Sequence, residues 1–170
     1  MRNRPILGLA TAAVLFVLDQ LAKLGITQGL KLDELSDALA LTGFFNLRFV
    51  ANHGVSLGLL TADNALTRWA LVALTAAIAI GVAVWMTRES NRQDQFALGL
   101  ILGGALGNIV DRVRLGYVVD YADLHFGDWR PFLVFNLADA AITIGVLILL
   151  VRALLTRDKR PAAPVESPHA

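Results

Sequence analysis

The chain lacks cysteine altogether and carries few charged side chains. Without cysteine, disulfide bonds, thiol nucleophiles and thiolate metal sites are excluded. Charged residues make up only 17% of the 170 residues and the net charge is +1, which gives no basic surface for nucleic acid. The three histidines (His53, His125 and His169) are scattered, and no two have the spacing of a metal-binding pair. We therefore expect no cofactor and no metal.

Long apolar segments dominate the chain instead. Hydrophobic residues make up 56% of it, and four segments approach the ~20 residues that a helix needs to cross a bilayer: residues 6–26, 66–86, 96–113 and 132–155. Backbone polar groups at membrane depth must be satisfied within the segment, so we predict helices. The first segment starts near Arg2 and Arg4, as a signal peptide would. Polar residues recur inside it and no cleavage site follows, so we interpret it as a retained helix.

The connections between these segments differ in character. Within loop 27–65, the stretch Gly43–Val50 is aromatic and β-branched, which predicts one or two strands. Loop 114–131 lies on the same side of the membrane, and the tail 158–170 is of disordered composition. The distribution of arginine and lysine between the connecting segments favours a topology with both termini in the cytoplasm. We predict an integral membrane protein, mainly α, with one domain over residues 1–157, four transmembrane helices, a small extracytoplasmic β-sheet and loop region, and a disordered cytoplasmic tail.

Two aspartates lie next to apolar segments on the predicted outer side. Asp120 ends the stretch Gly116–Asp120, and Asp139 lies about two turns into the fourth predicted helix. A carboxylate at membrane depth is costly to keep charged and usually has a function. Two that meet cannot both ionise cheaply, so they would share a proton and suit acid–base chemistry.

Other polar residues have helical spacing. Asp19 and Lys23 share one face, as an ion pair that anchors packing or as part of a site. Asn108, Asp111 and Arg112 form a polar stripe, in which we expect Asp111 to be the local partner of a snorkelling arginine. The motif Gly54–Gly58 matches a serine nucleophile elbow around Ser56, but that motif needs a large α/β sheet for which four spans leave no room.

Four blocks of the sequence, in order and on four spans, resemble bacterial lipoprotein signal peptidases, also called signal peptidase II, an intramembrane aspartyl protease family. They cover the body of the chain from the first helix to the fourth and are specific only in combination. The blocks are Leu18–Lys23, Asn52–Gly58, Gly103–Arg112 with its continuation to Asp120, and Phe135–Asp139.

The resemblance implies an aspartyl endopeptidase of the bacterial inner membrane, with its site at the extracytoplasmic face. It would cut diacylglyceryl-modified prolipoproteins on the N-terminal side of the lipidated cysteine, with membrane phospholipid around it, as a monomer. Asp120 and Asp139 match the catalytic pair. The residues that match supporting or substrate-binding positions are Asp19, Lys23, Asn52, Gly104, Asn108, Arg112, Asn136 and Ala138. His53 and Leu57 depart from the family pattern in the second block.

Two other interpretations of the same residues are a small proton-coupled transporter and a non-catalytic scaffold. In the transporter, Asp19, Asp120 and Asp139 would relay protons, although the chain shows no internal repeat and few spans. In the scaffold, the glycine-rich third segment would serve assembly, and both Asp120 and Asp139 would tolerate replacement by asparagine.

Overall fold

Four long helices form the body of the protein in the computed structural model, which describes residues 5–54 and 65–157. They are α1 (Ile6–Leu24), continued by the π-helical turn η1 (Gly25–Gly29), α2 (Ala65–Arg88), α3 (Arg92–Arg114) and α4 (Leu137–Arg157). All four are long and apolar enough to cross a membrane. The predicted multi-pass helical membrane fold is confirmed.

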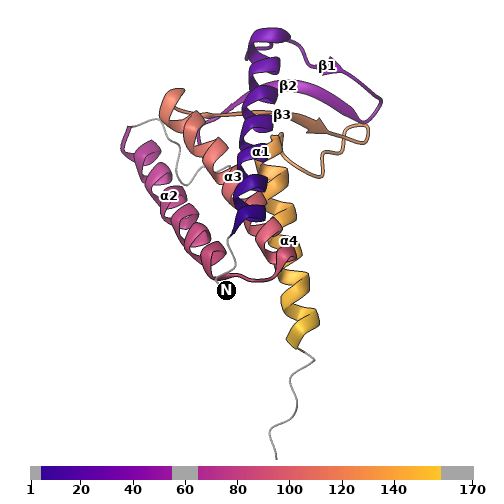
Figure 1. The fold of residues 1–170 in the computed structure, drawn as a ribbon. Coiled ribbons are helices and arrows are strands. Elements are labelled where there is room, and N and C mark those ends of the chain that lie inside the picture. The colour runs from indigo at the N-terminus through magenta and orange to yellow at the C-terminus, as the bar shows by residue number, and fades with distance from the viewer. Residues whose placement is uncertain (1–4, 55–64, 158–170) are drawn as a thin grey trace, which may run out of the picture.

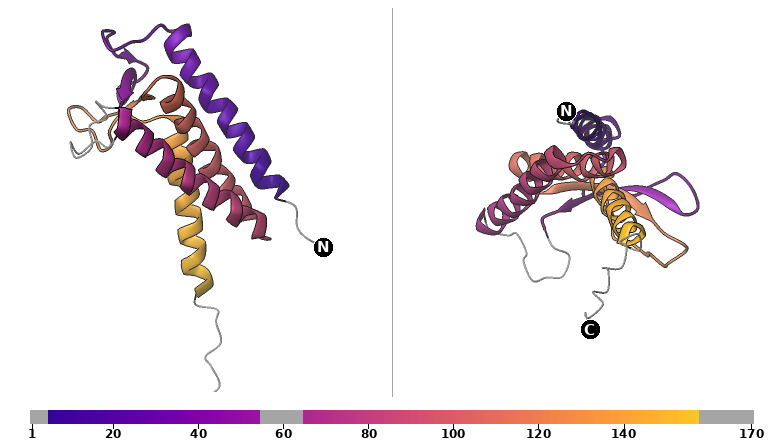
Figure 2. Two further views of the ribbon diagram at one scale, coloured as in Figure 1. Left: turned by 90° about the vertical axis from the view of Figure 1, so that its left-hand side faces the viewer. Right: turned by 60° about the horizontal axis from the view of Figure 1, so that its bottom comes forward.

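Helix α3 is the central element, and it packs against α1, α2 and α4 (Figures 1 and 2). Glycines on α3 allow this close approach. A Cβ atom at Gly103 would lie 2.6 Å from the backbone oxygen of Ala12 on α1, and one at Gly104 would lie 2.6 Å from that of Ala138 on α4. Small residues at helix crossings are the usual means by which membrane helices pack closely.

A three-stranded antiparallel sheet lies across one end of the helices (Figure 1). Its order is β1 (Leu39–Ala40), β2 (Phe45–Asn52) and β3 (Val118–Leu124). β2 confirms the strand predicted around Gly43–Val50, whereas β3 arises in the second loop, where we predicted none. The register sets Val50 opposite Asp120. The first turn of α1 and the last turns of α4 lie at the end of the bundle away from the sheet (Figure 1).

Helix α4 begins five residues later than the apolar pattern predicts. Phe135 is held in extended backbone by a two-way bridge to Ala122 of β3, and the helix starts only after Asn136. Asp139 therefore lies in the first turn of α4 instead of two turns inside it.

Helix α3 begins four residues earlier than predicted, at Arg92. The Asn91 side chain accepts hydrogen bonds from the backbone N–H groups of Gln93 and Asp94, and this cap extends the helix into polar sequence. Ser56 and the predicted tail 158–170 lie outside the described residues.

Candidate active site

Asp120 lies on β3, and its side chain is buried. Its Oδ2 accepts a hydrogen bond of 2.8 Å from Asn52 Nδ2 on β2, and its Oδ1 accepts one of 2.6 Å from Asn136 Nδ2. Burial raises the pKa of the Asp120 carboxyl to about 6, against the lowering effect of the amide from Asn52. The negative charge of Asp139 adds to the increase in pKa.

Asp139 is held by a reciprocal cap at the start of α4. The Asn136 Oδ1 atom accepts from the Asp139 backbone N–H at 2.9 Å, and Asp139 Oδ2 accepts from the Asn136 backbone N–H at 3.3 Å. This pattern satisfies two N–H groups at a helix start and fixes the carboxyl group against the helix end. Its second oxygen, Oδ1, accepts from Asn108 Nδ2 of α3 at 2.8 Å.

Asn136 joins the two aspartates directly. It contacts Asp120 through its side-chain amide and Asp139 through its side-chain oxygen and backbone N–H. Asn136 is fully buried and also donates to Asn108 Oδ1 at 3.3 Å. The geometry thus brings two carboxyl groups from β3 and α4 to one side chain, on the same end of the helix bundle.

The comparisons with known proteins agree with this geometry. A family model described as signal peptidase (SPase) II matches residues 11–155. The chain belongs to the signal peptidase II family. It is 55% identical to a lipoprotein signal peptidase of Rhizorhabdus wittichii over 168 residues, covering 99% of this chain and 95% of that one. It is 58% identical to one of Sphingopyxis alaskensis over 152 residues, covering 89% of this chain and 87% of that one.

Solved structures show the same fold. A bacterial membrane enzyme determined by the in meso method at 2.3 Å resolution superposes with a TM-score of 0.76 at 28% identity, covering 92% of this chain and 93% of that one. A second, at 1.9 Å resolution, gives a TM-score of 0.74 at 29% identity, covering 86% and 92%. The resemblance stated from the sequence is therefore confirmed, and the chain is a peptidase of this family.

Most of the polar residues predicted for the site of this signal peptidase II family member lie around the aspartate pair. Lys23 Nζ lies 3.2 Å from Asn108 Oδ1 and 2.8 Å from Asp19 Oδ2. Asp19 Oδ1 in turn accepts from the backbone N–H of Ala138 at 3.1 Å. Gly104 contributes by its lack of a side chain, which lets Ala138 and the first turn of α4 approach α3.

Arg112 lies close enough to the aspartate pair to interact with it electrostatically. Its guanidinium interacts electrostatically with Asp139, Asp120 and Asp111. Its Nε atom is buried and has no hydrogen-bond partner among the described residues. A buried donor without a partner is costly, so this guanidinium suits a group that arrives with a substrate.

The contacts of Asp111 differ from those that the sequence predicted. Asp111 is not simply the local partner of Arg112, because its Oδ2 lies 2.8 Å from Lys23 Nζ and accepts from the Val119 backbone N–H at 3.2 Å. The sequence hides this role, because Lys23 is remote along the chain and Val119 lies on a strand that the sequence analysis did not predict. His53, where the chain departs from the family pattern, is exposed, and its ring centroid lies 5.5 Å from that of Tyr117.

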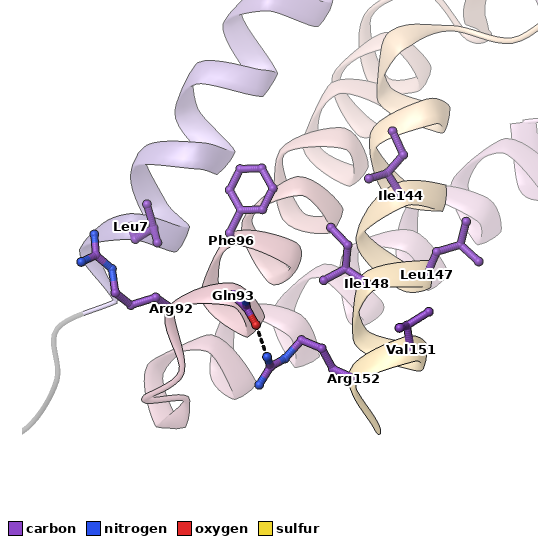
Figure 3. A pocket seen from close by; sticks show the side chains of 9 residues that line it. All are labelled: Leu7, Arg92, Gln93, Phe96, Ile144, Leu147, Ile148, Val151 and Arg152. Atoms are coloured by element: carbon purple, nitrogen blue, oxygen red, sulfur yellow. Dashed lines mark hydrogen bonds between the residues drawn. The ribbon is translucent and has the colours of Figure 1, made fainter. Parts of the chain in front are cut away.

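A large apolar groove runs along the helices toward the other end of the bundle, and its lining includes none of the polar residues named above for this site. It has a volume of about 690 Å³ between α1, α3 and α4, and two arginines mark its end (Figure 3). Arg152 of this rim is held by Asp94 and Gln93. Arg92 precedes Asn108 by 16 residues of α3, about 24 Å of helix rise at 1.5 Å per residue. The arginine end of the groove is therefore remote from the aspartates, whereas Ile144, at the opposite end of the groove, follows Asp139 by five residues of α4, about 7.5 Å of helix rise.

Proposed function

We propose that this peptidase removes signal peptides from prolipoproteins that carry diacylglycerol on a cysteine, cutting on the N-terminal side of that cysteine. The observation that carries the proposal is the convergence of Asp120 and Asp139 on Asn136. The names of its relatives, lipoprotein signal peptidases, supply the substrate class. A lipid-anchored substrate fits a site at the end of the helices, where a peptide bond lies near the membrane surface while acyl chains stay in the bilayer.

The pair of carboxyl groups performs the hydrolysis by general acid–base catalysis. When active, the pair holds one proton, because two negative charges that share the neighbour Asn136 in a buried site repel each other. The ionised member takes a proton from water, whose oxygen then bonds to the scissile carbonyl carbon. The protonated member gives its proton to the developing oxyanion. When this tetrahedral intermediate collapses, the C–N bond breaks and the leaving amine of the cysteine takes the proton that the first carboxylate drew from water, while a hydroxyl proton of the intermediate returns to the second carboxylate.

Neighbouring donors hold the reacting groups. Asn52 and Asn136 each donate to a different oxygen of Asp120, and Asn108 donates to Asp139. The unpartnered donor of Arg112 is available to the substrate's carbonyl groups or to its lipid headgroup. Donors preset in this way stabilise developing negative charge without having to reorganise during the reaction.

The site lies at the extracytoplasmic face of the bacterial inner membrane in this proposal. In the sequence, arginine and lysine are concentrated in the short segments at the end of the bundle away from the sheet, and Arg88 and Arg92 flank the short connection between α2 and α3. Short cytoplasmic segments carry such an excess of arginine and lysine. The sheet and the aspartate pair then lie outside, where the cleavage site of an exported lipoprotein arrives.

The substrate class is tested with purified protein and one prolipoprotein in two forms, diacylated and unmodified. We expect cleavage of the diacylated form, with mass spectrometry showing the lipidated cysteine at the new N-terminus. Equal cleavage of both forms, or a cut elsewhere, contradicts the proposed specificity.

A further inference from the structure

Three charged residues beside the active site take no part in the acid–base steps. Asp19 and Lys23 of α1 and Asp111 of α3 form one ion cluster, with Lys23 Nζ 2.8 Å from a carboxylate oxygen of each aspartate. All three are buried, with exposed fractions of 0%, 4% and 4%. Burying ions costs several kcal/mol each and is weak evidence for a stabilising role, so the cluster calls for another explanation.

Each carboxylate of the cluster also holds one backbone N–H group next to an active-site aspartate. Asp19 Oδ1 accepts from Ala138, which directly precedes Asp139. Asp111 Oδ2 accepts from Val119, which directly precedes Asp120. We call these two contacts, Asp19 to Ala138 and Asp111 to Val119, the two arms of the cluster. In each arm a carboxylate accepts from the backbone N–H that precedes an active-site aspartate. The two carboxylates come from different helices and hold different elements.

Lys23 connects the two arms and extends to a third contact. Its ammonium group also donates to Asn108 Oδ1 at 3.2 Å. Since an ammonium group only donates, this contact fixes the amide of Asn108 with its oxygen toward Lys23. The Nδ2 atom of Asn108 is then left to donate to Asp139 at 2.8 Å.

We propose that Asp19, Lys23 and Asp111 act as one positioning unit that sets the separation and direction of the Asp120 and Asp139 carboxyl groups. Asp111 is the newly assigned member, a positioning residue that acts through Val119 and Lys23. This inference rests on the proposed function. It explains why an ion cluster is retained between α1 and α3, where apolar side chains would pack at lower cost.

The test compares Asp111→Asn and Asp111→Ala with the unchanged enzyme on a diacylated prolipoprotein. The native carboxylate accepts from Lys23, Val119 and Gln20. The asparagine keeps one of its oxygens, and alanine keeps none. We expect kcat to fall by about 100-fold for alanine, the size of effect that a 1 Å misplacement produces, and by less for asparagine. KM should stay within about twofold, because the transition state loses more than the bound substrate does.

Asp94→Asn is the matched control, because Asp94 also lies on α3 and pairs with a cation of another helix, Arg152. It should lower the thermal midpoint without lowering kcat. Hydrogen exchange at the Val119 amide gives a second readout, which should accelerate in Asp111→Ala and not in Asp94→Asn.

Asp19→Asn tests the second arm independently of Asp111 and should also lower kcat with KM nearly unchanged. Unchanged kcat in the Asp111 and Asp19 variants overturns the inference, and it leaves the proposed function intact if Asp120→Asn is inactive. An active Asp120→Asn enzyme overturns the proposed function itself.

Discussion

At the scale of single residues, Asn136 organises the active site. Its amide nitrogen donates to Asp120, and its oxygen caps the first turn of α4 at Asp139. A neutral side chain that bridges two carboxyl groups keeps them apart without supplying a countercharge. In the proposed mechanism the pair then retains its mutual repulsion, and for this reason it holds a single proton.

The raised pKa of Asp120 predicts how activity depends on pH. Burial and the charge of Asp139 raise this pKa to about 6, while the amides of Asn52 and Asn136 and the charge of Lys23 lower it. The shared proton is therefore present below about pH 6 and is lost above it. We expect kcat/KM to fall about tenfold per pH unit on this basic side, as measured by initial rates in mixed buffers.

Replacing Asn52 should shift the basic limb of the pH–rate profile, which is the fall in kcat/KM above about pH 6. Asn52→Ala removes a hydrogen bond that favours the ionised form of Asp120, so the pKa rises and the fall in kcat/KM begins at higher pH. Asn46→Ala, on the same strand and paired in register with Asp123, is the control and should leave the limb in place. A limb that does not move in Asn52→Ala means that Asp120 is not the group that titrates.

At the scale of elements, the contact between α3 and the first turn of α4 sets the depth of the site. The Ala138 N–H is held by Asp19, and the Ala138 carbonyl lies against Gly104. The start of α4 is thus fixed on both sides of the residue that precedes Asp139. A small shift of this helix end moves the Asp139 carboxyl group itself.

A methyl group at Gly104 should therefore damage both stability and activity. In Gly104→Ala the new Cβ would lie 2.6 Å from the Ala138 oxygen, too close for a backbone atom to tolerate without movement. Such overpacking costs about 1–3 kcal/mol, visible as a lower thermal midpoint. Gly81→Ala on α2 is the control, because a Cβ there meets nothing within 4 Å. Equal midpoints for the two variants would show that the close crossing is unimportant.

At the scale of the whole molecule, the helix bundle places the sheet and the candidate active site at one end and the short α2–α3 connection, flanked by Arg88 and Arg92, at the other (Figure 1). The absence of cysteine makes this arrangement easy to test, because one introduced cysteine is then the sole thiol. Suitable positions are Glu34, exposed after η1, and Ser90, exposed between α2 and α3.

We expect a membrane-impermeant maleimide to label Glu34→Cys in intact spheroplasts. Ser90→Cys should react only after the membrane is permeabilised, because the α2–α3 connection faces the cytoplasm in the proposed topology. The opposite pattern would place the active site on the cytoplasmic side and contradict the proposed access to exported substrates.

The sequence revealed the fold and the aspartate pair because their signals are local. Apolar runs mark the spans, and Asp120 and Asp139 each follow one. The start of α4 was missed because Phe132–Phe135 are as apolar as a helix, while a bridge to Ala122 keeps Phe135 extended. The second role of Asp111 was missed because Lys23 and Val119 become its neighbours only after folding.

The central claim is that Asp120 and Asp139 act as one catalytic unit. The most direct measurement is the single-turnover cleavage rate of a diacylated prolipoprotein by Asp120→Asn, by Asp139→Asn and by the double variant, each checked for folding by its thermal midpoint. We predict that either single change lowers the rate by at least about 10³-fold and that the double change adds little further loss. Substantial cleavage by both single variants would contradict the claim.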